Sequence, residues 1–213
     1  YILGGVDSPS KWMFYIWDGA TASWKIVGAD ANTTDDIWYN LVALWDGATA
    51  KLYVNGVEQA DTESVASVAY GTPNQNAFIS EYAGSNNFEG NVSNVALFNS
   101  ALSSSDINTI YNNGRPGDLT SLSPIAWWKL GEEAFSTDPA ADPNGWTVPD
   151  QIGSNDATSS GNPDLVGEAP QSFANGLSVS MDIDDRIGES GFSDNNALSY
   201  NMDSEARTTD TAP

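Results

Sequence analysis

Short stretches of alternating large apolar and polar residues, separated by Gly, Asn and Asp turns, fill the chain from residue 1 to about residue 118. Strands with one buried face alternate in this way, because successive side chains point to opposite sides of a sheet. Turns at short, regular intervals are typical of sandwiches of antiparallel strands. The pattern predicts an all-β core, an antiparallel β-sandwich, over residues 1–118.

Two consecutive hairpins are predicted inside this region. In each, aromatic and β-branched residues flank an Asp-Gly pair, first within 13–27 and then within 38–54. Asp-Gly is a strong signal for a tight hairpin turn. The hexapeptide Trp-Asp-Gly-Ala-Thr-Ala occurs unchanged at both turns, at 17–22 and at 45–50. We therefore expect the same turn chemistry twice, as a local echo rather than a repeat architecture.

Further strands and one helix complete the predicted core. Apolar residues at 77–82 and 92–98 indicate strands. The spacing then becomes helical, since Ser103 and Asp106 match a capping box, an apolar stripe follows, and a Gly shortly before a Pro marks the end. The sequence predicts one short helix near 104–112.

The second hairpin and the segment 88–102 resemble laminin-G-like domains of the concanavalin A-like lectin/glucanase class. In that family a Trp-led strand meets a strand ending in an Asn-Gly turn, as Trp38 and the pair at 55–56 do here. Segment 88–102 is similar to the family's last strand. The resemblance covers roughly 12–115. It implies a jelly-roll sandwich with one short helix, followed in this chain by a long irregular C-terminal tail.

This chain departs from the family pattern in two places. Family members often carry an Asp-Glu pair in the last strand, where this chain has Ser93 and Asn94, which argues against a family calcium site. The family's opening strands have no counterpart before Tyr1, whereas 127–131 resembles such an opening. The module is therefore either permuted or followed by the start of a second unit.

Beyond residue 118 the composition shifts toward Ser, Asp, Pro and Asn. We divide this part into a linker at 119–170 with one aromatic strand, and an acidic tail at 171–213. The aromatic strand, at 125–130, is suited to add to a sheet edge, either in its own domain or in a neighbouring chain.

The acidic tail has little to bury, so ordering it requires contacts from a partner. It contains related Leu-Ser-x-x-Met-Asp segments at 177–182 and 198–203. We expect it to act as a strap between subunits. The predicted assembly contacts are Trp127, Trp128, Leu177, Met181, Arg186, Leu198, Met202 and Arg207.

Composition excludes several classes of function. The chain has no Cys and no His, which removes thiol nucleophiles, imidazole bases and the usual nitrogen and sulfur ligands of zinc. It has 29 acidic and 7 basic residues, a formal net charge of -22 that repels phosphate backbones and anionic lipids. No segment approaches the roughly 20 apolar residues that cross a bilayer. We expect neither nucleic-acid binding nor membrane insertion.

Carboxylate chemistry is the remaining route to catalysis. Glucanases of this class place two Glu side chains around one glycosidic bond, and the Glu-x-Asp-x-x-Glu strand motif that delivers them is missing from this chain. The nearest acidic cluster, Asp61 and Glu63, is predicted to lie in a polar loop. We expect no enzymatic activity.

Calcium is the one cofactor that the sequence leaves open. Asp182, Asp184 and Asp185 offer three carboxylates in four residues. They lack the Gly turn and the final Glu of an EF-hand loop. A solvated acidic run is the alternative, and no other cofactor is expected.

Tryptophan side chains are the candidates for glycan binding. Their flat apolar faces match the C–H faces of pyranose rings, although alternating aromatic residues in a sandwich also form cores. The candidates are Trp12, Trp17, Trp24, Trp38 and Trp45.

Two functions remain. The laminin-G-like module, the Trp-Thr-Val-Pro-Asp stretch at 146–150 and the Met-Asp segments are together similar to structural proteins of tailed phages, especially marine ones. We therefore expect a non-enzymatic structural or adhesion subunit of a phage virion (a fibre, appendage or decoration protein) or of another surface assembly. Its partners would be copies of itself, other virion or surface proteins, and a cell-surface glycan. The alternative is a free extracellular lectin-like module that binds carbohydrate.

Overall fold

The computed structural model describes most of the chain before residue 160. The described residues are 2–7, 10–68, 78–79, 81–82, 86–88, 90–130, 133–136 and 145–159. The chain divides into two units between Leu165 and Val166, and all the described residues belong to the first.

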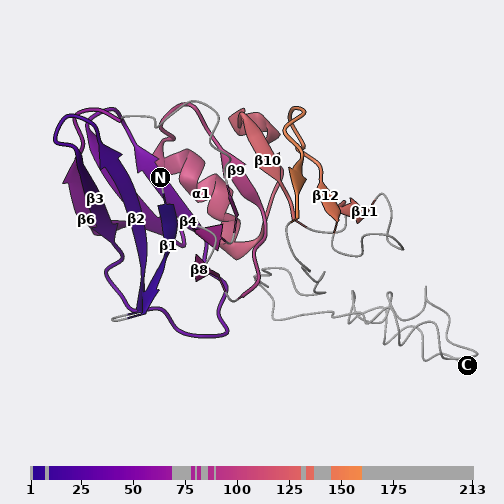
Figure 1. Cartoon of the computed structure of the whole chain (residues 1–213), viewed down its shortest axis with the longest axis horizontal. Coiled ribbons are helices and arrows are strands. Elements are labelled where there is room, and N and C mark those ends of the chain that lie inside the picture. Colours follow the sequence, from indigo (N-terminus) through magenta and orange to yellow (C-terminus); the bar gives the residue numbers. More distant parts are fainter. Residues whose placement is uncertain are drawn as a thin grey trace, which may run out of the picture. The chain divides into compact units, whose positions relative to one another are not determined.

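Two three-stranded antiparallel sheets form the centre of this unit (Figure 1). The first has the order β1-β2-β3 and the second β4-β5-β6, so each is a simple meander. The strands are β1 Ile2–Asp7, β2 Ser10–Asp18, β3 Ser23–Gly28, β4 Leu41–Trp45, β5 Thr49–Val54 and β6 Val57–Ser64.

The two sheets bury one face each against the other. Phe14 and Ile16 of β2 and Val27 of β3 form one cluster with Ala50 and Leu52 of β5. Every second residue of β2 from Phe14 onward is buried, as strand geometry requires for a face that meets a core. This cluster is the core of the sandwich.

The second sheet is covered on its other face by a helix. Helix α1, Ser104–Tyr111, inserts Ile107 between Leu44 of β4 and Tyr53 of β5. Strands β4 and β5 thus have apolar residues on both faces, and β4 is a continuous hydrophobic run. Gly56 has φ +77°, and a Cβ there would lie 3.0 Å from a side-chain atom of Tyr111. The turn after β5 therefore sits tightly under the helix.

A second, smaller cluster lies beyond the helix. Strand β9, Val95–Leu97, pairs antiparallel with β10, Ala126–Trp128. Trp128 packs with Val95 of β9 and with Val148 of β12, Trp146–Val148. The remaining short elements are β7 Glu81–Tyr82, β8 Asn86–Asn87, η1 Asn112–Gly114, η2 Thr120–Leu122, β11 Phe135–Ser136, β12 Trp146–Val148 and β13 Ala157–Thr158.

The fold class is as the sequence predicts: antiparallel sheets with one short helix. Both hairpins are present, and the capping box at Ser103 and Asp106 begins a helix that ends one residue before the predicted limit. The segment predicted as a strand at 92–98 pairs only over Val95–Leu97. Of the strand predicted at 77–82, residues 77 and 80 lie outside the described part, and Glu81–Tyr82 form a two-residue strand.

The prediction of a polar loop around Asp61 and Glu63 is wrong, because these residues lie in β6. The strand is mostly exposed, so its sequence lacks the apolar alternation that marks a half-buried strand. Its place in the sheet is set by pairing with β5.

The repeated hexapeptide forms two related turns of different length. In both, the aspartate accepts a hydrogen bond from the backbone N–H two residues later, at 3.0 Å for Asp18 and Ala20 and at 3.0 Å for Asp46 and Ala48. Asp18 is buried and also accepts from the backbone N–H of Ser67, whereas Asp46 lies in an exposed turn. The two turns share the aspartate-to-backbone hydrogen bond, but the next strand begins five residues after Asp18 and three residues after Asp46.

Candidate functional site

The five candidate tryptophans fall into different environments. Trp12 and Trp45 pack against the core of the sandwich, and the Trp45 indole donates to the carbonyl of Val65 at 3.1 Å. These two rings face inward and are no part of an exposed platform. Trp38 is half-buried, before β4.

Trp17 and Trp24 lie together on the outer face of the first sheet. They are directly opposite each other across β2 and β3, with ring centroids 5.4 Å apart and ring planes at 77°. Tyr15 and Ile26 form the next outward-facing pair in the same register. Trp24 is 47% exposed and Ile26 43% exposed. We call Tyr15, Trp17, Trp24 and Ile26 the outer aromatic face.

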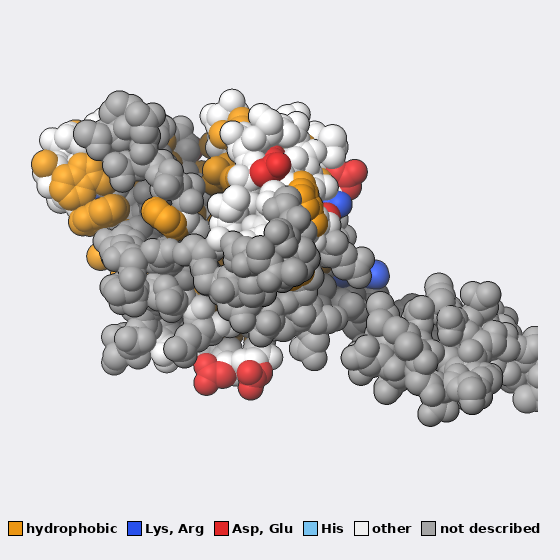
Figure 2. Space-filling model, turned by 45° about the vertical axis from the view of Figure 1, so that its right-hand side comes forward, with side chains coloured by type: hydrophobic (Ala, Val, Ile, Leu, Met, Phe, Trp, Pro, Cys, Tyr) orange, Lys and Arg blue, Asp and Glu red, His pale blue; other side chains and the backbone are white. Residues whose placement is uncertain are grey.

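The outer aromatic face is a surface on which flat apolar groups meet water. Figure 2 shows hydrophobic side chains gathered on the left of the molecule, the side that holds β2 and β3 in Figure 1. The edge-to-face contact holds the rings of Trp17 and Trp24 in fixed relative positions. Exposed apolar side chains that lie next to one another often mark an interaction site, whereas a single exposed apolar side chain is common on any protein surface.

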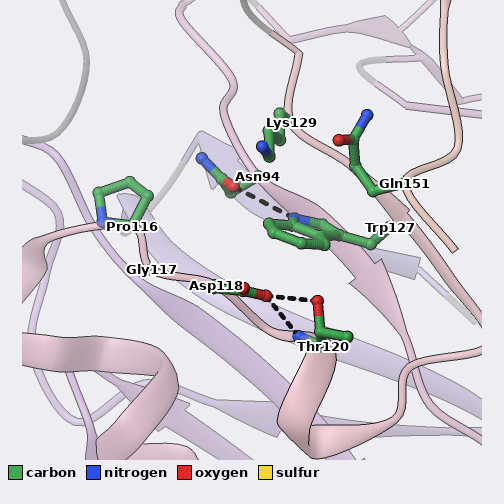
Figure 3. Close-up of a pocket in the computed structure, with 8 residues that line it drawn as sticks. All are labelled: Asn94, Pro116, Gly117, Asp118, Thr120, Trp127, Lys129 and Gln151. Carbon is green, nitrogen blue, oxygen red and sulfur yellow. Dashed lines mark hydrogen bonds between the residues drawn. The ribbon is translucent and has the colours of Figure 1, made fainter.

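A polar pocket of about 490 Å³ forms a second candidate site (Figure 3). It lies beside the β9–β10 pair and is lined in part by the chain that follows α1. Its lining residues are Asn94, Pro116, Gly117, Asp118, Thr120, Trp127, Lys129 and Gln151. In Figure 3 the Trp127 ring occupies the middle, with Asn94 and Lys129 on one side and Asp118 and Thr120 on the other.

Asn94 and Lys129 hold the Trp127 ring in place. The indole N–H of Trp127 donates to the side-chain oxygen of Asn94 at 3.2 Å, and the Lys129 ammonium lies 5.1 Å from the ring centroid. The backbone N–H of Asn94 donates to the carbonyl of Lys129 at 2.9 Å. Asn94 has φ +52°, a left-handed conformation that Asn tolerates better than most residues. Asn94, which stands where family members often carry an acidic residue, thus connects β9 to β10 in this chain.

Asp118 supplies a negative charge at the edge of the pocket. Its Oδ1 accepts hydrogen bonds from the hydroxyl and from the backbone N–H of Thr120. These bonds, the hydroxyl first, hold the pKa of Asp118 below its ordinary value, and the charge of Lys129 adds to the effect. Asp118 is therefore ionised at neutral pH.

The sequence did not indicate this pocket. Asn94, Asp118, Trp127 and Gln151 come from four separate segments, and only the pairing of β9 with β10 brings them together. The available signal was the aromatic strand at 125–130 itself, whose two Trp residues we predicted to make assembly contacts.

The prediction that Trp127 and Trp128 make assembly contacts is wrong. Both are buried within their own chain, 4% and 8% exposed, because β10 adds to β9 of the same molecule. The strand could add to a sheet edge of its own domain or of a neighbouring chain, and in the structure it pairs with β9 of its own domain. The other predicted assembly contacts, Leu177, Met181, Arg186, Leu198, Met202 and Arg207, lie outside the described residues.

The acidic side chains of β6 link elements of the sandwich. Asp61 accepts from the backbone N–H of Gly28 on β3 at 2.8 Å, and Glu63 lies 3.9 Å from the ammonium of Lys25. Glu58 accepts from the Tyr53 hydroxyl at 2.6 Å and pairs with Lys51 at 3.0 Å. The Tyr53 hydrogen bond, followed by that of Lys51, lowers the pKa of Glu58. Each of these carboxylates thus has a structural partner.

No group of three or more potential metal ligands gathers within the part of the chain that the structure describes. The calcium candidates Asp182, Asp184 and Asp185 lie outside that part.

Asp150 ties the loop after β12 to strand β10. Its carboxylate accepts from the backbone N–H of Trp127 at 2.9 Å, of Ile152 at 3.1 Å and of Asn155 at 3.3 Å. Burial by itself raises the pKa of Asp150, but these hydrogen bonds together lower it below the ordinary value. The stabilisation is therefore present above the unfolded-state pKa, about 3.9, and disappears as the pH falls through the lower folded-state pKa.

Replacing Asp150 with Asn should weaken this tie and flatten the acid response. An amide retains one oxygen but presents an N–H₂ group to other N–H donors, so we expect a melting temperature about 5 °C lower at pH 7. Melting curves between about pH 6 and pH 2 should show a smaller loss of stability for Asp150→Asn than for the native chain. Asp35→Asn, in an exposed loop, is the control. Equal pH slopes in all three proteins would contradict this assignment.

Among the described helices, none is long and apolar enough to cross a membrane.

Comparison with known proteins identifies the family. No curated protein and no solved structure matches the chain. A family model described as concanavalin A-like lectin/glucanases superfamily matches residues 1–108, half of the chain, which includes the β1-β2-β3 and β4-β5-β6 sheets of the sandwich. Its fold is of a carbohydrate-binding or adhesion type, in agreement with the antiparallel sandwich. The chain belongs to the concanavalin A-like lectin/glucanases superfamily.

Proposed function

We propose that this protein is a non-enzymatic adhesion subunit that binds a surface glycan through its outer aromatic face, within a phage virion or another surface assembly. The observation that carries the proposal is the Trp17–Trp24 pair, held edge to face on an exposed sheet face. A pyranose ring can lie against an exposed indole, because the C–H face of the sugar is apolar and flat.

The rest of the outer aromatic face supports this use. Trp24 and Ile26 come from the same strand two residues apart, so both side chains point outward. Their separation along a strand, about 7 Å, suits an extended saccharide better than a single small molecule. The net charge of -22 opposes the approach of polyanions, which favours a neutral glycan.

A non-catalytic role is part of the proposal. Glu58 and Glu63, two of the carboxylates that a glycosidase could use, are engaged with Lys51 and Lys25. The motif that supplies the catalytic pair in related glucanases is missing from the sequence. We expect no release of reducing ends from any polysaccharide that the protein binds.

The virion setting is supported by the sequence resemblance to phage structural proteins and by the tail predicted to act as a strap. The alternative is a free lectin-like module. A subunit of an assembly should form large oligomers in solution, whereas a free module should be a monomer. Mass determination in solution therefore separates the two.

Replacing Trp24 with Ala should weaken glycan binding at least tenfold. The substitution removes an exposed ring and leaves the core intact, so the melting temperature should change little. The measurement is a glycan array on the native chain, followed by titration of the best ligand against the native and Trp24→Ala chains.

Ile37→Ala is the matched control for this experiment. Ile37 is 54% exposed and lies between β3 and β4, outside the two strands that carry the outer aromatic face. It should bind glycan as the native chain does. Unchanged binding by Trp24→Ala, or equal losses in both variants, would remove the support for the outer aromatic face.

A further inference from the structure

The hexapeptide Trp-Asp-Gly-Ala-Thr-Ala closes its two hairpins in two different forms. In the second hairpin Trp45 pairs with Ala50, so the first and last residues of the hexapeptide lie opposite each other. In the first hairpin Trp17 pairs with Trp24, and Ala22, the last residue of the hexapeptide, stays in the turn. We call these the short form and the long form of the turn. The same six residues are thus compatible with both forms.

The apolar pattern of β2 and β3 does not choose between the two forms. In the short form the first hairpin would pair Trp17 with Ala22 and, two residues further along each strand, Tyr15 with Trp24. This register differs from the observed one by two residues of β3. Because side chains alternate between the faces of a sheet with a period of two, every side chain of β3 would keep its face. Trp24 would still point outward, but opposite Tyr15 instead of Trp17.

The long form has a backbone cost at Ala22. This residue has φ +48°, in the left-handed region that favours glycine and that residues with a Cβ adopt at a cost in free energy. In the short form the equivalent residue, Ala50, lies within strand β5. A residue in an unfavourable conformation persists only where surrounding contacts hold it there. Since the hexapeptide is the same in both turns, the contacts that select the long form come from outside it.

The segment that follows β6, residues 65–68, supplies such contacts to the first turn. The backbone N–H of Ser67 donates to the Asp18 carboxylate at 3.3 Å, and the backbone N–H of Gly19 donates to the carbonyl of Ser67 at 2.8 Å. Asp18 and Val68 also form an isolated antiparallel bridge. The start of the long turn is therefore bound to the chain of the second sheet.

Asp18 connects this segment to the turn itself. The buried carboxylate accepts from the backbone N–H of Ala20 at 3.0 Å and from the hydroxyl of Thr21 at 2.7 Å. The Thr21 hydrogen bond above all, and then the backbone bonds, hold the pKa of Asp18 below its ordinary value, although burial opposes them. The carboxylate is ionised at neutral pH, so its hydrogen bonds are charge-assisted. Asp46, its equivalent, accepts from two backbone N–H groups of its own exposed turn.

We propose that Asp18 is a positioning residue of the outer aromatic face, which selects the long form of the turn and thereby sets Trp17 opposite Trp24. Without the carboxylate the hairpin takes the short form, in which Trp24 lies opposite Tyr15 and the edge-to-face pair of indoles is lost. This role rests on the proposed function for its consequence in glycan binding. The choice of register is measured without any ligand.

The register is read from the two indoles in the full chain. Two indole rings held close together at a fixed angle couple their electronic transitions and give circular-dichroism bands of opposite sign, an exciton couplet. The Trp17–Trp24 pair, with ring centroids 5.4 Å apart and ring planes at 77°, meets this condition. Subtracting the spectrum of the corresponding Trp24→Phe protein isolates its couplet. We expect Asp18→Asn to lose most of the couplet, and NMR to show ring contacts of Trp24 with Tyr15 instead of Trp17.

Variants at Ala22 test the same choice with Asp18 intact. Ala22→Gly removes the cost of the positive φ, so it should keep the couplet and raise the melting temperature by a few degrees. Ala22→Val places a β-branched residue where φ is positive and should lose the couplet. The double variant Asp18→Asn with Ala22→Gly should regain most of the couplet that Asp18→Asn loses.

Asp46→Asn is the matched control, since it makes the same change in the same hexapeptide at the short turn. It should keep the full couplet. The role of Asp18 is refuted if Asp18→Asn, folded at the temperature of measurement, keeps both the couplet and the Trp17–Trp24 contacts, or if Asp46→Asn loses as much. Where Asp18→Asn does not fold, equal couplets in Ala22→Gly and Ala22→Val refute it.

Glycan titration separates this role from the proposed function. Asp18→Asn should weaken glycan binding about as much as Trp24→Ala does. If Asp18→Asn loses the couplet but binds as the native chain does, while Trp24→Ala binds weakly, the glycan needs Trp24 without its partner and Asp18 has no positioning role. If Trp24→Ala binds as the native chain does, the proposed function fails, and the couplets still decide whether Asp18 sets the register.

Discussion

Ending the chain at Asp118 should lower the melting temperature of the sandwich by roughly 10 °C. Strand β9 pairs with β10 over three residue pairs, and the backbone N–H groups of Ile125 and Asn94 add further bonds to the same junction. Each such bond contributes about 1 kcal/mol net, so the total is about 3 kcal/mol or more. For a domain of this size, about 1 kcal/mol corresponds to several degrees. Thermal melting followed by circular dichroism measures the loss.

The same truncation should also reduce solubility. Without β10, the edge of β9 has unpaired N–H and C=O groups, and Val95 loses the apolar cover of Trp128. An open strand edge beside apolar side chains promotes association between molecules. We expect limited proteolysis to cut near residues 91–98 in the truncated chain before it cuts there in the full chain.

A chain ending at Ser159 is the control, because it retains β10 and the three strands that follow it. It should melt close to the full-length protein. It also tests the proposed strap: if the tail joins subunits, this chain should stay folded and lose the large oligomers. If the chains ending at Asp118 and at Ser159 have the same melting temperature, β10 contributes little to the stability of the sandwich. Equal oligomers with and without the tail would argue against the strap.

The sequence was sufficient for elements whose physical cause is local. The aspartate turns, the capping box at Ser103 and the alternation in β2 each depend on residues close together in the chain, and each formed as predicted. Strand β6 was missed because its exposed sequence carries no apolar period, and pairing with β5 alone defines it.

The residues of the candidate sites were harder to predict from the sequence, because their exposure depends on which face of a sheet is covered by other elements. Trp17 and Trp45 begin identical hexapeptides, yet one ring lies on an outer face and the other packs against the core. No local pattern separates them, since the difference is set by where the second sheet packs. The pocket at Trp127 required the pairing of β9 with β10, two strands far apart in the sequence.

Replacing Ile107 with Ala should destabilise the sandwich by about 3 kcal/mol. Ile107 is fully buried, and it is the residue of α1 that fills the space between Leu44 and Tyr53. Truncation leaves a cavity, because the helix is held at both of its ends and cannot collapse into the gap. One end has its capping box at Ser103, and the other lies over the turn at Gly56. Urea unfolding followed by tryptophan fluorescence measures the change in the free energy of unfolding.

Ile110→Ala is the matched control, since it makes the same change on the same helix at a half-buried position. Helix propensity favours Ala over Ile in both cases, so a difference between the two variants reports on packing alone. Ile110→Ala should cost about 1 kcal/mol or less, because less apolar surface returns to water. Similar losses in the two variants would mean that α1 is not anchored by Ile107. Other contacts would then hold α1 against the outer face of the second sheet.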